Sequence, residues 1–317
     1  MTERVVRANG IDMRVVEMGA GPLVVLCHGF PELAHSWRHQ LPALARAGYH
    51  AVAPDMRGYG GTSRPERVEA YDIVHLTGDV LGLIDAMGEE RAVLVGHDWG
   101  AQVVWNLALR APERVRGVAA MSVPYRARSK RPPTTIWKTA FADRWFYMLY
   151  FQEPGVADAD LGHDPATFLR RLLCAAGGEP SGAQLGPLVG ARDGRGMVER
   201  LPEPDRLPGW LPQEDLDHYA AVFARTGFTG GLNWYRNIDR NWELTPELAD
   251  ARVEVPALFV AGAGDPVLAM MPAEGMEAWV TDLRGMVVVA GAGHWVQQER
   301  PAEVNEALAR FLAGLDG

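Results

Sequence analysis

The stretch AVLVGHDWGAQVVWNLALR, residues 92–110, decides the fold of this chain. It begins with the apolar run 92–95, passes through the pentapeptide GHDWG at 96–100, and ends in a helical pattern that reaches Arg110. A Gly-x-nucleophile-x-Gly turn between a strand and a helix exposes its central side chain above a parallel sheet, and its glycines leave room for the tight backbone. The pattern therefore predicts such a turn with Asp98 at its centre.

An aspartate at this position changes the chemistry of the turn. A serine must lose its proton to a base before it attacks, whereas an aspartate, with a reference pKa of about 3.9, is already ionised at neutral pH. A carboxylate that attacks a saturated carbon forms an ester, and a histidine is then free to activate water against that ester. Asp98 thus indicates hydrolysis of an alkylating substrate. An isolated aspartate before a helix is commonly only an N-cap, so the assignment depends on the residues that accompany it.

Composition limits the classes of protein to consider. The chain has 317 residues, of which 48% are hydrophobic and 22% charged, enough for one large core with an inserted domain. The formal net charge of -9 argues against nucleic acid or an anionic membrane as a partner, and a small neutral substrate fits better.

The two cysteines, Cys27 and Cys174, bear on the compartment. Residues 1–4 run straight into a strand-like segment without an apolar signal region, and no stretch approaches the roughly 18 apolar residues of a membrane helix. We therefore expect a cytoplasmic protein with free thiols. Neither cysteine has metal-ligand spacing, so both are interpreted as packing residues, and we expect no metal and no cofactor.

Short apolar runs alternate with helical patterns, which is typical of a parallel sheet covered on both faces. The predicted strands are 23–27, 50–54, 92–95, 117–123, 257–261 and 286–290. The predicted helices are 37–47, 74–87, 99–110, 276–282 and 302–315. Such a sheet carries its catalytic residues in loops beyond the carboxyl ends of the strands.

The alternation stops after Pro124 and resumes at residues 253–256. We interpret residues 1–124 and 245–317 as an α/β core and residues 125–244 as an inserted, mostly helical cap domain. Within the cap, residues 175–212 are rich in glycine and proline, and we expect this loop to dock partly over a pocket. Its apolar anchors are Leu185, Leu188, Val189, Met197 and Leu201.

Two further residues complete a triad in the order nucleophile, acid, histidine. Asp265 follows the penultimate predicted strand, and Pro266 biases it toward an extended backbone. His294 lies in the glycine-rich loop 290–295, after the last strand and before the last helix. The strand 117–123 ends without a carboxylate, which removes the main competitor of Asp265.

Hydrolysis of an ester passes through an oxyanion, so backbone N–H donors should converge near the nucleophile. The segment CHGFP, residues 27–31, follows a strand and supplies one such donor, the amide of Phe30; the amide of Trp99 supplies the other. A proline in so tight a turn is compatible with a cis Phe30-Pro31 bond. His28 and His97 are interpreted as residues that hold the loops in shape.

Together these motifs resemble the soluble epoxide hydrolase family of the α/β-hydrolase fold. The resemblance covers nearly the whole chain, through HGFPE at 28–32, DMRGYG at 55–60, GHDWG at 96–100, YFQEPG at 150–155 and NWYRN at 233–237. It implies an α/β-hydrolase core with a cap, and an enzyme that converts epoxides to vicinal diols through an aspartyl ester. A small epoxide and water would be its partners, and a homodimer stays open.

In this family two cap tyrosines hydrogen-bond the epoxide oxygen, and the matching positions are Tyr147 and Tyr235. A phenol with a pKa of about 10 can protonate the far more basic alkoxide of an opening epoxide. Tyr147, Tyr150 and Phe151 have helical spacing, so spacing alone does not separate the first two tyrosines. The family pattern favours Tyr147.

Three alternative functions compete with epoxide hydrolysis. A haloalkane-type dehalogenase shares the aspartate turn, and Trp99 could hold its halide, but the cap tyrosines favour an epoxide. A non-catalytic ligand-binding relative should have lost at least one residue of the set, and all are present. An ordinary esterase is disfavoured because no serine occupies the turn, and Ser63 and Ser122 each run into a proline where the glycine is needed.

Overall fold

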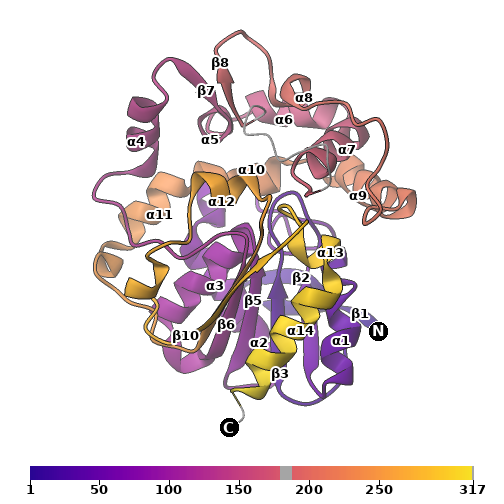
Figure 1. The fold of residues 1–317 in the computed structure, drawn as a ribbon, viewed down its shortest axis with the longest axis vertical. Helices are drawn as coiled ribbons and strands as arrows, with labels where there is room; N and C mark the ends of the chain where they lie inside the picture. The colour runs from indigo at the N-terminus through magenta and orange to yellow at the C-terminus, as the bar shows by residue number, and fades with distance from the viewer. Residues whose placement is uncertain (179–187, 316–317) are drawn as a thin grey trace.

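The core of the molecule is an eight-stranded, mostly parallel sheet (Figure 1). The computed structural model describes residues 1–178 and 188–315. The strand order is β1-β2-β4-β3-β5-β6-β9-β10, with β1 and β2 forming an antiparallel hairpin at one edge. The strands are β1 (Thr2–Ala8), β2 (Ile11–Met18), β3 (Leu23–Cys27), β4 (His50–Pro54), β5 (Ala92–His97), β6 (Val115–Met121), β9 (Ala257–Gly262) and β10 (Leu283–Val289). The predicted parallel sheet is confirmed.

Helices cover both faces of this sheet because its strand side chains alternate between two apolar clusters. In β3, Val25 packs with the cluster that contains α2 (Ile73–Ala86) and α3 (Trp99–Arg110). Its neighbours Val24 and Leu26 pack with α1 (Gln40–Arg46) and α14 (Pro301–Ala313). Strands buried on both faces need apolar residues at every position, which explains the continuous runs in the sequence.

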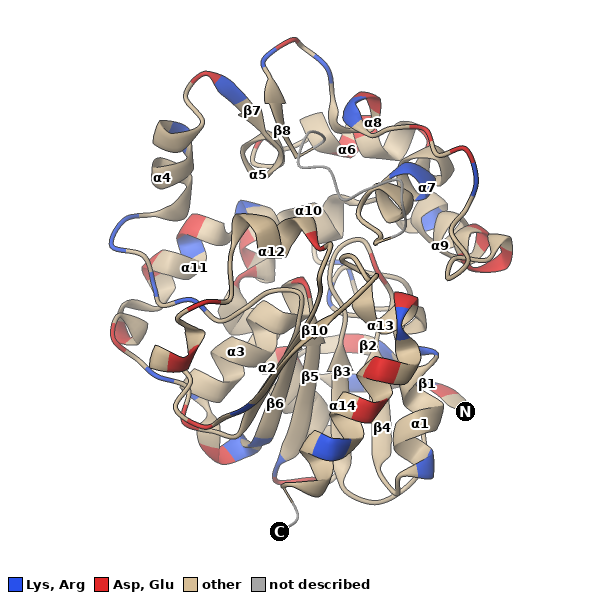
Figure 2. Ribbon diagram, in the orientation of Figure 1, with Lys and Arg blue, Asp and Glu red and all other residues tan. Residues whose placement is uncertain are grey.

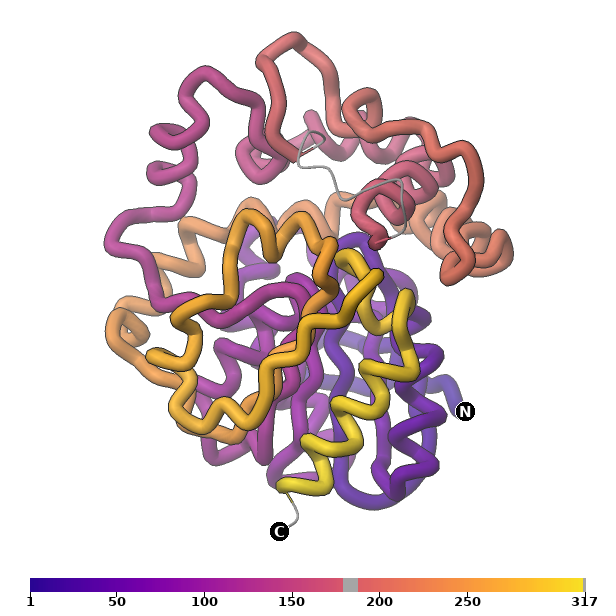
Figure 3. The backbone as a smooth tube through the Cα atoms, in the orientation of Figure 1, coloured from indigo at the N-terminus to yellow at the C-terminus, as the bar shows by residue number. Residues whose placement is uncertain are grey.

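A helical insertion lies between β6 and β9 and covers one end of the sheet (Figures 1 and 3). Its helices are α4 (Pro133–Ala140), α5 (Tyr147–Tyr150), α6 (Val156–His163), α7 (Pro165–Ala175), α8 (Met197–Arg200), α9 (Gln213–Thr226), α10 (Thr229–Arg236) and α11 (Ile238–Leu244). The strands β7 (Arg144–Phe146) and β8 (Val189–Ala191), which are remote in sequence, pair as a separate two-stranded antiparallel sheet within the insertion. Of the expected anchors, Leu185 is outside the described residues, whereas Val189, Met197 and Leu201 are buried. Among the described helices, none is long and apolar enough to cross a bilayer.

The predicted helix 276–282 is wrong. Only a single 3-10 turn, η5 (Met276–Ala278), forms there, after Gly275 at φ +82°. Val280 instead forms a parallel bridge with Val253, so pairing of the backbone replaces the helix. The strand predicted to reach residue 123 ends at Met121, because Ser122 adopts φ +67° and turns the chain.

The structure differs from the predicted elements at two further places. The helix predicted over 37–47 is a 3-10 turn, η1 (Ala34–Trp37), followed by α1 from Gln40. The N-terminal segment is strand-like in sequence, but the hairpin that β1 forms with β2 is absent from the predicted strands, because the first four residues of β1 are exposed and lack an apolar run.

Arg57 and Asp79 form a buried ion pair in the core. The Nε of Arg57 donates to Asp79 Oδ2 at 2.7 Å, and the two side chains are 4% and 0% exposed. Asn9 donates to the other carboxylate oxygen, Oδ1, at 2.8 Å. The carbonyl of Arg57 accepts from the indole of Trp234 in α10, so the pair also lies under a helix of the insertion.

Removing one partner of this pair should be costly. Asp79→Ala leaves the guanidinium of Arg57 buried without a counter-charge, and we expect the free energy of unfolding to fall by about 3–5 kcal/mol. Urea denaturation followed by circular dichroism measures the change. The matched control is Glu306→Gln in the exposed pair with Arg310, expected to cost under about 0.5 kcal/mol. Equal effects of the two substitutions would contradict the assignment.

Candidate active site

Asp98 stands on a strained turn between β5 and α3. Its backbone has φ +53° and ψ -118°, a conformation that side-chain-bearing residues rarely adopt. The flanking glycines make the turn possible, because a Cβ at Gly96 would meet the carbonyl of Gly100, and a Cβ at Gly100 would meet that of Cys27. The turn predicted from the sequence is therefore present, with the Asp98 side chain 14% exposed.

The structure brings Asp265 and His294 to this carboxylate. Nε2 of His294 lies 3.6 Å from Asp98 Oδ2, and Nδ1 of the same ring lies 3.1 Å from Asp265 Oδ1. Asp265 is the N-cap of α12 (Pro266–Met270), where its carboxylate also accepts from the Val267 N–H at 2.8 Å. The imidazole therefore sits between two carboxylates.

This arrangement shifts the pKa of the histidine. Burial lowers the pKa of His294, but the carboxylates of Asp265 and Asp98 outweigh burial and hold it well above its ordinary value. For Asp265, burial raises the pKa, but His294 and the Val267 N–H outweigh that effect and lower it. The resting site thus favours an imidazolium between two anions.

One of the two expected oxyanion donors already touches the carboxylate. The N–H of Phe30 donates to Asp98 Oδ1 at 2.8 Å, and the Phe30-Pro31 bond that follows it is cis. Trp99 is the first residue of α3, where backbone N–H groups have no partner within the helix. A Cβ at Gly29 would overlap the Asp98 carboxylate, so this loop can approach the nucleophile only with glycine there.

Two buried tyrosines from the insertion lie near Asp98. Tyr147 begins α5, Tyr235 lies in α10, and their ring centroids are 6.2 Å apart. Burial and the charge of Asp98 raise the pKa of both phenols, which keeps them protonated as hydrogen-bond donors. Tyr150 points elsewhere, since its hydroxyl donates to Asp160 Oδ2 at 3.0 Å.

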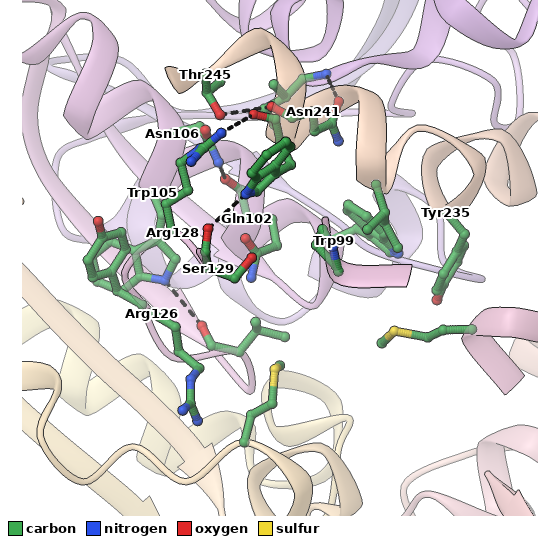
Figure 4. A pocket seen from close by; sticks show the side chains of 18 of the residues that line it. Trp99, Gln102, Trp105, Asn106, Arg126, Arg128, Ser129, Tyr235, Asn241 and Thr245 are labelled. Carbon is green, nitrogen blue, oxygen red and sulfur yellow. Dashed lines mark hydrogen bonds between the residues drawn. The ribbon is translucent and has the colours of Figure 1, made fainter. Parts of the chain in front are cut away.

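A cavity of about 310 Å³ connects these groups (Figure 4). Asp98, Trp99, Tyr147 and Tyr235 line it, and apolar side chains such as Leu109 form much of its wall. Its residues come from both the core and the insertion. Within residues 1–178 and 188–315, no group of three or more histidine, cysteine, aspartate or glutamate residues could hold a metal ion.

Sequence reasoning missed Glu32, which organises the loops around the site. Its side chain is fully buried and accepts from His97 Nδ1 at 2.5 Å and from the Gly29 N–H at 3.0 Å. The other ring nitrogen of His97 lies 2.7 Å from the carbonyl of His294. Burial raises the pKa of Glu32, but His97 and its other partners bring it to about 2. The only feature of the sequence that marks Glu32 is its position as a charged residue directly after HGFP, residues 28–31.

Glu299 was missed as well. Its carboxylate accepts from the N–H groups of Gly293 and Trp295, both at 3.0 Å, and from that of Gly178 at 2.7 Å. Gly293 and Trp295 flank His294, whereas Gly178 follows α7 of the insertion. Glu299 therefore ties the histidine loop to the insertion, and nothing in the sequence distinguishes it from an ordinary helix-end glutamate.

Comparison with known proteins identifies the family of this chain. The family model described as the alpha/beta hydrolase fold matches residues 22–301. Epoxide hydrolase A of Mycobacterium tuberculosis is 55% identical over 99% of this chain and 98% of its own length. The crystal structure of epoxide hydrolase A from Mycobacterium thermoresistibile superposes with a TM-score of 0.94 at 56% identity, covering 99% of this chain and 98% of that one.

A more distant structure has the same architecture. An epoxide hydrolase from an endophytic Streptomyces is 40% identical, with a TM-score of 0.95, over 99% of this chain and 96% of that one. These relatives span the core and the insertion alike. The chain therefore belongs to the epoxide hydrolases of the α/β-hydrolase fold.

Proposed function

We propose that this enzyme converts epoxides to vicinal diols in two steps, through an ester on Asp98. One observation carries the proposal: the Asp98 carboxylate, on its strained turn, shares a single cavity with the two tyrosines Tyr147 and Tyr235. An ionised nucleophile and two phenol donors are the groups that opening of an epoxide requires. The tyrosines also favour an epoxide over a haloalkane, because a departing halide needs no proton.

In the first step, a carboxylate oxygen of Asp98 attacks one epoxide carbon. The carbon–oxygen bond of the ring breaks, and negative charge moves from Asp98 to the epoxide oxygen. Tyr147 and Tyr235 donate hydrogen bonds to this oxygen, and one of them supplies the proton. Because the charge of Asp98 helps to raise both phenol pKa values, its loss during attack makes the tyrosines better acids as the alkoxide forms.

In the second step, His294 takes a proton from water, and the hydroxide attacks the carbonyl carbon of the ester. The N–H groups of Phe30 and Trp99 stabilise the oxyanion that results. Asp265 orients the imidazole and stabilises its charged form. Collapse of the intermediate expels the alkoxide, which takes the proton of the attacking hydroxide, so the diol is released and the Asp98 carboxylate is regenerated. The resting imidazolium of His294 gives its proton to the tyrosinate after the first step, and the proton taken from water restores it.

The wider assignments are part of the same proposal. Residues 125–244 act as a cap over a core of residues 1–124 and 245–317. Epoxide and water are the partners, and a homodimer would leave the chemistry unchanged because every proposed catalytic residue comes from one chain. The buried free thiols of Cys27 and Cys174 support a reducing, cytoplasmic location.

The overall activity has a direct test. Diol formation from an aryl epoxide and halide release from a haloalkane are measured with the same preparation. We expect diol and no halide. Halide release without diol would favour the dehalogenase alternative.

The division of labour predicts a trapped intermediate. In His294→Gln the nucleophile remains, but the base that activates water is lost, so the protein should accumulate as an adduct with the mass of one substrate. Intact-protein mass spectrometry after exposure to the epoxide detects it. Asp98→Asn is the control and should initially show no adduct. An unmodified His294→Gln protein that still binds epoxide would count against the ester.

The tyrosines provide a second, internally matched prediction. Tyr147→Phe and Tyr235→Phe should each slow ester formation by roughly 10–10³-fold, because each removes a donor to the developing alkoxide. Tyr150→Phe also removes a phenol hydroxyl, three residues from Tyr147. It should have little effect, since the hydroxyl of Tyr150 donates to Asp160. Rapid-quench measurement of ester formation tests all three. Damage by Tyr150→Phe alone would transfer the role to that residue.

The pKa of His294 should depend on the charge of Asp98. Both carboxylates raise this pKa, so loss of one anion on esterification should lower it and free the imidazole to act as a base. Asp98→Asn imitates the neutral ester, and NMR titration of His294 should give a lower pKa than in the wild type. The rate of ester hydrolysis should correspondingly rise with pH and then level. An unchanged or higher pKa in Asp98→Asn would refute this coupling.

A further inference from the structure

A basic segment borders the cavity. Residues 126–131 read RARSKR, with four cations and no acid, in a chain whose formal net charge is -9. The segment leads from β6 toward α4, and Figure 2 shows it in blue beside α11. Such a concentration of one charge opposes the overall field of the protein and therefore calls for a local explanation.

Two of these cations line the cavity itself, Arg126 and Arg128. The guanidinium of Arg128 lies 4.1 Å from the centroid of the Trp242 ring, and its Nη2 donates to the Trp242 carbonyl at 2.8 Å. Stacking on an aromatic ring fixes the plane of the guanidinium. Its Nε is buried and has no hydrogen-bond partner among the described residues.

Neither arginine is neutralised by a carboxylate of the residues that the structure describes. In the described part of the chain, no carboxylate lies within 4.0 Å of the guanidinium of Arg126 or Arg128. Of the described cavity-lining residues, Asp98 alone is acidic. Figure 4 shows Arg126 on the opposite side of the view from Tyr235, with apolar and amide side chains between. The cavity thus has a reacting end and a separate cationic end.

We propose that Arg126 and Arg128 form a carboxylate-binding subsite, so that the enzyme takes epoxides with an apolar body and an anionic far end. This inference rests on the proposed function, whose substrate it makes more specific. Planar guanidinium groups match carboxylate oxygens. Arg128 is half-buried, so the apolar wall lowers the local dielectric constant and strengthens its attraction, whereas Arg126 is exposed and its attraction is screened more by solvent. The net negative charge of the chain suggests a neutral substrate. The local positive charge of Arg126 and Arg128 favours an anionic substrate instead.

The test compares ω-epoxyalkanoates of increasing chain length with their uncharged methyl amides. At the best length, the wild-type kcat/KM should favour the carboxylate about tenfold, the size of a charge-assisted hydrogen bond. This ratio should fall toward one in Arg126→Gln and in Arg128→Gln, and Arg126→Lys should restore part of it. Lys130→Gln is the matched control, because Lys130 belongs to the same segment but does not line the cavity.

Each outcome separates the subsite from the reaction. Turnover of the amides at a rate equal to that of the carboxylates would overturn the subsite and leave the proposed function intact. An equal loss of preference in Lys130→Gln would mean a diffuse field and would also overturn it. If neither series is hydrolysed, the proposed function fails. Calorimetry then tests the subsite on its own, by comparing the binding of a saturated alkanoate with that of its methyl amide. Tighter binding of the alkanoate that is lost in Arg126→Gln supports the subsite, and equal binding of the two compounds refutes it.

Discussion

The strained backbone of Asp98 is the constraint on which the rest of the site depends. A non-glycine residue at φ +53° costs of order 1–3 kcal/mol and persists only where its surroundings over-determine it. Here the surroundings are the close contacts at Gly96 and Gly100 and the hydrogen bond from the Phe30 N–H. The contacts that stabilise this strained backbone also place the Asp98 carboxylate above the sheet. There it lies near the imidazole of His294 and the phenols of Tyr147 and Tyr235.

One charge then governs the protonation of several groups. The anion at Asp98 raises the pKa of His294, Tyr147 and Tyr235 together. A resting site with an ionised Asp98 therefore holds its protons on the histidine and the phenols. In the proposed mechanism, covalent attack removes that charge. The two phenols then become better proton donors to the alkoxide, and the imidazole gives up its resting proton, so that its neutral form can accept one from water. Burial amplifies these effects because little solvent screens them.

The sequence was sufficient for much of this site because parallel strands end at a common edge. Asp98 and Asp265 each follow an apolar run, and His294 follows the last strand, so their convergence could be predicted without coordinates. Tyr147 and Tyr150 could not be separated, since both fit a helical stripe and only the bond to Asp160 distinguishes them. The failed helix at 276–282 has a similar cause: its end pairs with Val253, a contact remote in sequence.

The buried carboxylates show why supporting residues escape prediction. Glu32 and Glu299 act through backbone N–H groups and side chains that are distant along the chain, and a glutamate in such a position has no local pattern. Their consequence is structural coupling: Glu299 joins the histidine loop to Gly178, and the indole of Trp295 donates to the Leu173 carbonyl in α7 at 2.9 Å. The insertion that supplies Tyr147 and Tyr235 is thereby anchored to the loop that carries His294, so one connected network positions the proposed acids and the proposed base.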